Sequence, residues 1–455
     1  MSRPDFILRH GIIVTHEGAA PADVAVEKDK IVAIEKNFAG SAGEEIDCTG
    51  LHLFPGLIDS HVHFNEPGRE AWEGIETGSR LLAAGGATLF FDMPLNAHPP
   101  TIDAESFHQK HERARTKSIL DFALWGGIVP GNSHRLEELA ACGVIGFKAF
   151  MADSGIEDFP RVDDAALRAG MKQAARLNLP VAVHAESQEI LGRLERERSG
   201  RNATSVRDFL ASRPMAAELE AIARALELAG ETGCALHVVH VSCAEGVELI
   251  TEARRRGVDV SCETCPHYLV LTEEDMMRLG AVAKCAPPLR SAGQVEKLWQ
   301  QVVTGGIDTI GSDHSPSRPE MKSGDDFFKV WGGISGGQHT LSLLLSETAG
   351  AGARRATLPL PAIVRLTSYH VAKRFRLPEN KNGIRVGADA DLALVNLSER
   401  FELAREELLD RHRQSPYVGR RLSGRVVRTF VRGQTVFKDG KIVAKRLGQL
   451  VAPNR

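Results

Sequence analysis

Two histidines separated by a single residue are the side chains in this sequence best suited to binding a metal ion. His61 and His63 stand in Asp59-Ser60-His61-Val62-His63, directly after the apolar run Leu53-Phe54-Pro55-Gly56-Leu57-Ile58. Side chains alternate along a strand, so both imidazoles point to the same side. Neutral imidazole is the commonest nitrogen ligand of zinc-like metals. The pair predicts half of a metal site, and two ordinary polar residues at a strand end are the alternative for this motif alone.

Further residues of metal-ligand type follow later apolar runs. They are Lys148 in Phe147-Lys148-Ala149-Phe150, His184 in Val183-His184-Ala185-Glu186, His240 in Val239-His240-Val241-Ser242 and Asp313 in Gly311-Ser312-Asp313-His314. Taken singly, each has an ordinary explanation, such as a buried core histidine, a helix cap at Asp313 or a lysine that reaches solvent. Such explanations would have to hold at all five strand ends together. The set therefore favours one shared metal site.

The residues between these motifs predict the scaffold that brings them together. Eight strand-like apolar runs cover 56–63, 87–93, 121–129, 144–150, 181–185, 235–241, 259–264 and 309–313, with helix-like segments between them such as 70–84, 164–177, 214–231 and 244–256. Eight β/α units in series predict an α/β fold, a closed parallel (β/α)8 TIM-like barrel. Barrel active sites lie at the carboxyl ends of the strands, so the ligand candidates would share one rim.

Both flanks of the chain have a different character. Short strands separated by turns are predicted at 7–8, 12–14, 24–26 and 31–34, and again at 390–395, 426–431 and 436–437. Neither flank has enough strands for a stable sheet of its own. We therefore expect a small β-sandwich domain built from both chain ends, 1–53 and 381–455, around a catalytic barrel at 54–380.

Composition and charge exclude several classes of protein. The 455 residues carry a net charge of −3 and no basic field for nucleic acid or a membrane surface. Seven scattered cysteines favour a reducing compartment, and the lone Cys262-Glu263-Thr264-Cys265 is predicted as buried strand residues. The apolar run Phe6-Ile7-Leu8 is too short for a signal peptide. We expect a soluble cytoplasmic protein. Nucleotide binding is not expected, because no glycine-rich phosphate-binding loop follows a predicted strand.

Lys148 needs its own chemistry to join a metal site, because an ammonium group is a poor ligand. A neutral lysine amine can add carbon dioxide to form a carbamate, which is an anion with two oxygens that can bridge two cations. Burial lowers the pKa of a lysine and favours the reactive amine. We therefore hypothesise that Lys148 is N6-carboxylated.

Together these motifs resemble the cyclic amidohydrolases of the amidohydrolase superfamily over essentially the whole chain. The resemblance implies that His61, His63, Lys148 and Asp313 hold one metal, and that Lys148, His184 and His240 hold the other. It implies two divalent metal ions per subunit; zinc is the expected metal, and iron, cobalt or manganese are the alternatives. It also implies a homotetramer, and hydrolysis of a cyclic amide by a hydroxide shared between the metals, with Asp313 as general base and then general acid.

Three features narrow the substrate that the resemblance implies. Asn65 stands where dihydroorotases carry an arginine for the substrate carboxylate, and Asp153 stands where hydantoinases carry a tyrosine. The segments 72–74, 92–96 and 331–334 resemble the allantoinase branch of the family. The implied substrate is then a small molecule, allantoin, hydrolysed to allantoate in ureide catabolism. The alternatives are hydantoinase (dihydropyrimidinase) activity, dihydroorotase activity, or a catalytically silent scaffold protein of the same fold.

Candidate substrate-binding residues are less distinctive. Asn96 could bind the ureido group, or could simply be a turn residue after a proline. Ala286 and Gly332 resemble positions whose backbone groups hold a cyclic amide. His267, in Cys265-Pro266-His267-Tyr268, belongs to a recurrent family segment but has no assigned role.

Overall fold

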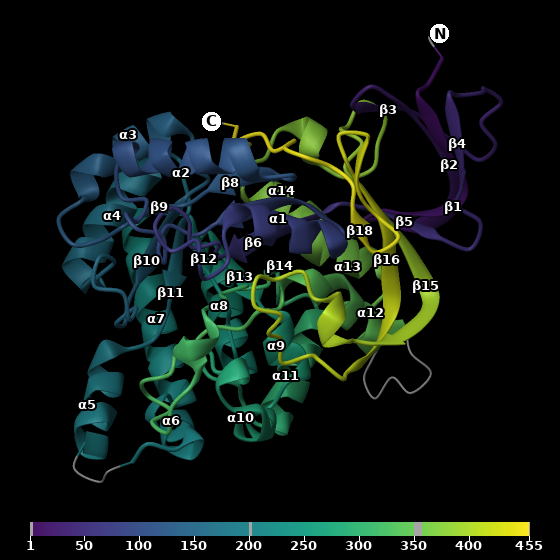
Figure 1. The fold of residues 1–455 in the computed structure, drawn as a ribbon. Coiled ribbons are helices and arrows are strands. Elements are labelled where there is room, and N and C mark those ends of the chain that lie inside the picture. Colours follow the sequence, from purple (N-terminus) through teal and green to yellow (C-terminus); the bar gives the residue numbers. More distant parts are fainter. Residues whose placement is uncertain (1–2, 200–202, 350–356, 455) are drawn as a thin grey trace.

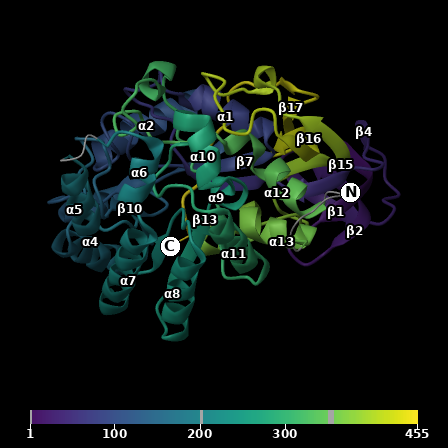
Figure 2. The ribbon, with the colours of Figure 1, turned by 90° about the horizontal axis from the view of Figure 1, so that it is seen from below.

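The computed structural model describes residues 3–199, 203–349 and 357–454 of the chain. A ring of parallel strands surrounded by helices lies beside a long, mostly antiparallel sheet (Figure 1). Seen from below, the helices surround the ring and the sheet lies to one side (Figure 2). The N-terminal strands and the last long strands thus lie together, away from the helices of the middle of the chain.

Eight parallel strand positions form the ring. They are β6 (Leu57–Val62), β7 (Ala87–Asp92), β8 (Asp121–Leu124) continued by β9 (Gly126–Gly127), β10 (Phe147–Phe150), β11 (Val181–His184), β12 (Leu236–Val238), β13 (Val260–Thr264) and β14 (Thr309–Ile310). Strands β6–β8 form one ladder and β9–β14 form another. A parallel bridge between Val62 and His314 joins the two ends of the ring. The structure therefore contains the (β/α)8 barrel predicted from the apolar runs.

Two strands end three residues earlier than the sequence predicted, and a residue with left-handed backbone follows each of them. β12 ends at Val238 and β14 at Ile310, short of the expected residues 241 and 313. His240 and Asp313, just beyond these ends, have φ of 43° and 45°. A left-handed backbone is incompatible with a regular strand. The early ends therefore turn both side chains away from the ladder.

Helices cover the outside of the barrel. The larger ones are α1 (Ile75–Ala84), α2 (Ala104–Lys117), α3 (Leu136–Cys142), α4 (Asp164–Arg176), α7 (Met215–Thr232), α8 (Ala244–Arg255) and α11 (Ala292–Val303). Local sequence explains several of their ends: Asp103 accepts from Ser106 N in a capping box before α2, and Asp163 caps α4. The predicted helix at 70–84 begins only at Ile75, because Gly74 before it has a φ of 85°.

Further helices follow, several of them near the carboxyl ends of the barrel strands. They are α5 (Gln188–Ser199), α6 (Val206–Ser212), α9 (Pro266–Val270), α10 (Glu273–Leu279) and α12 (Thr340–Ala349), with α13 (Leu360–Val364) and α14 (His370–Arg374) further along the chain. Figure 1 shows α5 and α6 projecting beyond the ring. Side chains from this end of the barrel form the walls of the site described below.

Both chain ends build one sheet. Its strands are β1 (Phe6–Val14), β2 (Ala19–Glu27), β3 (Lys30–Glu35), β4 (Glu44–Asp47), β5 (His52–Pro55), β15 (Leu392–Glu402), β16 (Arg421–Val431), β17 (Gln434–Lys438) and β18 (Lys441–Ile442). β5 pairs antiparallel with β15, which joins the two halves. Buried Phe6, Leu392 and Phe430 share its apolar core. The expected common β-domain is present, and its boundaries at 53/54 and 380/381 remain a proposal.

One sequence expectation about this sheet was wrong. The runs at 7–8 and 12–14 form a single strand, β1, with a register shift between Leu8 and Gly11. The polar pair Arg9-His10 interrupts the apolar pattern without ending the strand. Arg9 donates to Asp23 at 3.0 Å and His10 N donates to the same carboxylate at 2.9 Å. These contacts hold a charged residue within the strand.

A buried ion cluster joins the sheet to the barrel. Lys381 Nζ donates to Asp121 at 2.6 Å and to Asp391 at 2.8 Å, and it lies 2.8 Å from Asp389. Asp121 begins β8, so the cluster lies at the end of the barrel opposite to the strand ends that carry the metal-ligand candidates. Buried carboxylates need such a cation, because their desolvation is otherwise uncompensated.

Two predictions about the whole chain can be compared with this structure. No helix within the described ranges is long and apolar enough to span a bilayer. All seven cysteines are free; Cys262 lies in β13 and Cys265 just before α9, and both are buried.

Candidate metal centre and substrate cavity

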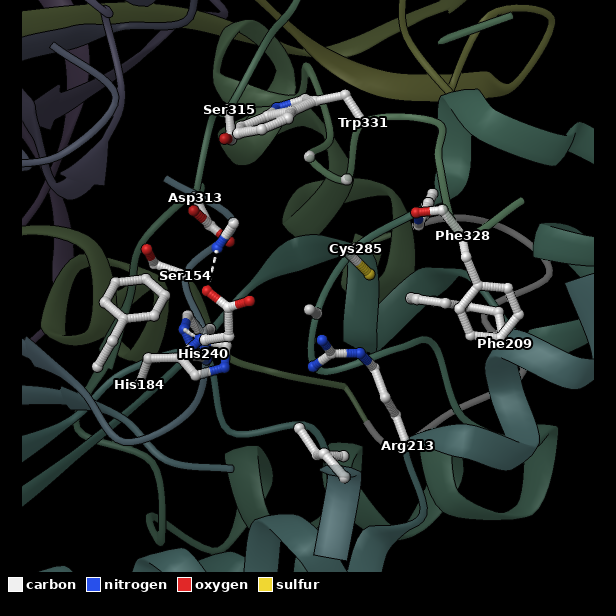
Figure 3. A pocket seen from close by; sticks show the side chains of 18 of the residues that line it. Ser154, His184, Phe209, Arg213, His240, Cys285, Asp313, Ser315, Phe328 and Trp331 are labelled. Carbon is white, nitrogen blue, oxygen red and sulfur yellow. Dashed lines mark hydrogen bonds between the residues drawn. The ribbon is translucent and has the colours of Figure 1, made fainter. Parts of the chain in front are cut away.

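The predicted ligands gather at the carboxyl end of the barrel. His61 lies in β6 with His63 just after it, His184 ends β11, and His240 and Asp313 follow β12 and β14. All five side chains line one cavity of about 470 Å³. Figure 3 shows His184, His240 and Asp313 together at this cavity. Its volume lies in the usual range for small-molecule sites.

His61, His63 and Asp313 form the first half-site. The Nε2 atoms of His61 and His63 each lie 3.3 Å from Asp313 Oδ1. Two ligands about 2.0–2.1 Å from one tetrahedral zinc are roughly 3.3 Å apart, so this spacing fits a metal. On its far side, His61 Nδ1 lies 2.8 Å from Glu263 Oε1. A carboxylate can only accept, so Nδ1 carries the proton and Nε2 keeps its lone pair for a metal.

His184 and His240 form the second half-site. His184 Nδ1 lies 3.1 Å from His240 Nε2, and His184 Nε2 lies 2.8 Å from Glu186 Oε2. The Phe150 ring stacks on His184 at 4.6 Å and 9° and restricts its plane. Burial lowers the pKa of both histidines, so both are neutral and able to act as ligands.

Lys148 is fully buried in β10 and, unlike the other five predicted ligands, is not among the residues that line the cavity. Among the described residues, no group accepts a hydrogen bond from its Nζ, although a buried polar atom normally has a partner. Burial also lowers the pKa of Lys148 to about 8, which favours a neutral amine. The unpartnered amine and the nitrogen and oxygen donors around the cavity fit a site that divalent metals complete.

Four non-glycine residues at or next to this site have left-handed backbone conformations. Asn65, Asn96, His240 and Asp313 have φ of 62°, 65°, 43° and 45°. Such strain in non-glycine residues is costly and clusters at functional sites. Burial raises the pKa of Asp313, but His61 and His63 outweigh it and hold that pKa well below its usual range. Asp313 is therefore an ionised carboxylate at the cavity wall.

The candidate substrate-binding residues lie at the same cavity. Asn96, Ala286 and Gly332 all line it, as does Asp153. Asn96 Nδ2 also lies 3.4 Å from His63 Nδ1, so Asn96 is in contact with a predicted ligand. Their roles in binding remain a prediction. His267 is buried, and among the described residues its two ring nitrogens have no hydrogen-bond partner.

Sequence reasoning missed three charged residues at this site: Glu186 and Glu263 behind the cavity histidines, and Arg213 in the cavity wall. A weak signal existed for two of them. Glu186 stands two residues after His184, and Glu263 is a lone acid in an otherwise uncharged strand. Arg213, at the end of α6, carries no signal in the sequence, because only the tertiary structure brings it to Glu186.

Comparison with known proteins agrees with this geometry. The sequence model described as the Amidohydrolase family matches residues 52–436. The chain belongs to the amidohydrolase family. This amidohydrolase is 54% identical to an allantoinase of Rubrobacter xylanophilus over 100% of its own length and 99% of that protein. It is 52% identical to an allantoinase of Solibacter usitatus, over 98% and 96% of the two chains.

Solved structures confirm the fold. An L-hydantoinase (dihydropyrimidinase) from Arthrobacter aurescens superposes with a TM-score of 0.94 at 34% identity, over 99% of this chain and 100% of that one. A dihydropyrimidinase from Brevibacillus agri superposes with a TM-score of 0.91 at 31% identity, over 99% of each chain. The predicted family and fold class are confirmed, and this amidohydrolase is an enzyme.

Proposed function

We propose that this enzyme opens the ring of allantoin, a neutral cyclic amide with a ureido substituent, to give allantoate. The observation that carries the proposal is the full-length 54% identity to an allantoinase, in a chain whose predicted histidine and aspartate ligands line one cavity. The hydantoinases among its structural neighbours are more distant, at 34% identity. Asn65 and Asp153, in place of the arginine and tyrosine of the other branches, agree with a neutral substrate that is not a simple hydantoin.

Two divalent ions complete the proposed site, and zinc suits its nitrogen and oxygen donors. His61, His63 and Asp313 would hold one ion, His184 and His240 the other, and a carboxylated Lys148 would hold both. Bound metals lower the pKa of water towards neutrality and polarise a carbonyl group. The buried, unpartnered Nζ of Lys148 supports the carboxylation, because a carbamate there would satisfy the group.

In the proposed reaction the chain itself handles protons and excludes bulk water. Water contributes its oxygen to the carbonyl carbon, the ring carbon–nitrogen bond breaks, and the nitrogen gains a proton. Asp313 is ionised and lies at the cavity, so it can accept the proton of the attacking water and pass it to the departing nitrogen. Phe150 and Trp331 line the same cavity and reduce solvent access. Asn96 and the backbones of Ala286 and Gly332 would orient the ring.

A substrate panel tests this proposal. Protein stripped of metal and reconstituted with zinc, cobalt or manganese is assayed for ring opening of allantoin, hydantoin, dihydrouracil and dihydroorotate. We expect allantoin to give the highest kcat/KM and the stripped protein to be inactive. A higher kcat/KM for hydantoin or dihydrouracil would instead support the dihydropyrimidinase alternative. Protein that binds two metals and turns over none of the four substrates would support the silent scaffold.

We also propose a homotetramer in the cytoplasm. The tetramer follows from the family resemblance, and the cytoplasm from seven free cysteines, which are typical of a reducing compartment. Light scattering after size exclusion measures the assembly directly, and a monomer would contradict it.

A further inference from the structure

Two buried carboxylates lie behind the two half-sites. Glu263 contacts His61 Nδ1 at 2.8 Å, and Glu186 contacts His184 Nε2 at 2.8 Å. Both side chains are almost completely buried, with exposures of 0% and 1%. Neither is among the residues that line the cavity. They therefore act on the site through the histidines and not through the substrate.

The two carboxylates are held in different ways. Glu263 Oε2 accepts from Ser60 Oγ at 2.6 Å and lies 3.5 Å from His237 Nε2, so its partners all lie on barrel strands. Glu186 instead forms an ion pair with Arg213, whose side chain lines the cavity. Figure 3 shows the Arg213 guanidinium turned towards His184 and His240. The support of the second half-site thus comes from outside the barrel.

Arg213 is itself fixed by a second arginine. The buried Arg290 donates from Nη1 to Arg213 O at 2.7 Å and from Nη2 to Glu218 Oε2 at 2.9 Å. Its Nε donates to Ser242 Oγ at 2.9 Å. Ser242 stands two residues after His240, so the same network reaches the chain segment that carries the second histidine of this half-site. The first half-site is not part of these contacts.

The Glu186 contact also decides the tautomer of His184. An ionised carboxylate accepts hydrogen bonds and cannot donate them. The proton of a neutral His184 must then sit on Nε2, which leaves the Nδ1 lone pair directed at the space shared with His240 Nε2, 3.1 Å away. Without the carboxylate, the ring is free to place its proton on Nδ1 and lose that lone pair.

We propose that Glu186 and Arg213 are positioning residues that set the retention of the metal at His184 and His240, independently of the metal at His61 and His63. This inference builds on the proposed two-metal function. Glu263 plays the corresponding part for the first half-site. Partners of this kind typically change metal affinity by about 10- to 100-fold.

The test measures bound metal rather than activity. Full-length Glu186→Gln, Glu263→Gln and the exposed control Glu197→Gln are loaded with zinc, titrated with a chelator and analysed for metal per subunit. We expect the parent and Glu197→Gln each to bind two ions, and the affinity of each ion to be the same in the two proteins. Glu186→Gln should hold one ion as the parent does and the other about 10- to 100-fold more weakly.

A double-mutant comparison assigns the weakened ion. Adding Glu186→Gln to His240→Ala should cause little further loss of metal, because both changes act on one half-site. Adding Glu263→Gln to His240→Ala should weaken the remaining ion as well. Arg213→Met should reproduce Glu186→Gln, and Arg213→Lys should recover part of the affinity. The Arg213 variants also provide the test if Glu186→Gln does not fold.

The outcomes separate this inference from the proposed function. A folded Glu186→Gln and Arg213→Met that both hold two ions with parental affinity would overturn the inference alone. Equal weakening of both ions by Glu186→Gln would overturn the claimed independence of the half-sites. A parent that binds fewer than two ions would overturn the two-metal site on which the inference builds.

Discussion

At the scale of single residues, Asp313 combines two properties that serve a proton carrier at a metal site. Its Oδ1 lies 3.3 Å from Nε2 of both His61 and His63, and its pKa is held well below the usual range. Its φ of 45° turns the carboxylate out of the strand direction and towards the cavity. A residue in this position can be a ligand and still exchange a proton with substrate.

Asp313→Asn separates these two roles. The amide oxygen can still face the metal, but the amide cannot accept a proton, so we expect kcat to fall by roughly 10²- to 10⁴-fold. Metal content, measured by mass spectrometry, should stay close to that of the parent. Turnover near the parental rate would show that another group carries the proton.

Lys148→Ala tests the carboxylated bridge. Removing the only group proposed to hold both ions should lower metal content and reduce activity by more than about 100-fold. Short-chain carboxylic acids should restore part of the activity, because they can occupy the space of the lost carbamate. Native mass spectrometry of the parent should show the added mass of carbon dioxide on Lys148, and an unmodified lysine in active enzyme would contradict the hypothesis.

At the scale of elements, the segment after β14 forms one wall of the cavity without regular secondary structure around Trp331. The buried Lys284 and the half-buried Lys322 hold it. Lys284 Nζ donates to the carbonyls of Phe327 and Val330, each at 2.6 Å. Lys322 Nζ donates to the carbonyls of Gly333 at 2.6 Å and Ala281 at 3.1 Å. Side-chain ammonium groups here replace the ladder bonds that a strand would supply.

Lys322→Met should therefore loosen this wall. Each carbonyl that loses a buried partner costs about 1–3 kcal/mol of stability, and the wall that carries Gly332 becomes less ordered. We expect KM to rise by more than kcat falls, measured in steady-state assays. Lys297→Met, an exposed lysine on α11, serves as the control and should change neither constant. A Lys322→Met enzyme with unchanged KM and stability would show that the wall does not depend on this contact.

At the scale of the whole molecule, the C-terminal part of the chain returns to cover the barrel near the site. Arg411 Nε donates to the Glu73 carbonyl at 2.6 Å, and Arg411 N lies 3.3 Å from the Glu73 carboxyl oxygens. Burial raises the pKa of Glu73 to about 8 from an ordinary value of 4.5. The Arg411 contacts lower that pKa, but burial outweighs them, so Glu73 is protonated at neutral pH.

This raised pKa predicts how stability depends on pH. The folded state holds the Glu73 proton up to about pH 8, while the unfolded chain loses it near 4.5, so stability falls as pH rises between these values. The slope is about 1.4 kcal/mol per pH unit. Glu73→Gln removes this term, so the variant should lose less stability than the parent between pH 6 and pH 8. Parallel denaturant curves for the two proteins would contradict the assignment.

Local pattern was enough to predict the architecture. Apolar runs of strand length separated by amphipathic segments predicted all eight barrel positions, because burial on both faces leaves a continuous apolar signature. The six candidate ligands were found because each stands at or just after such a run. The boundaries were less accurate at β12 and β14, which end three residues before their predicted limits and are followed by the left-handed backbone of His240 and Asp313.

The amino-acid sequence by itself determined the barrel, the sheet shared by both chain ends and the family of this enzyme. These follow from periodicity and from residue types at strand ends, which are properties of neighbours along the chain. Only the tertiary structure decided that Glu263 supports His61 while Glu186, Arg213 and Arg290 support His184. Apart from the Glu186–His184 pair, which is two residues apart, those contacts join residues from separate strands, loops and helices, so local spacing does not encode them.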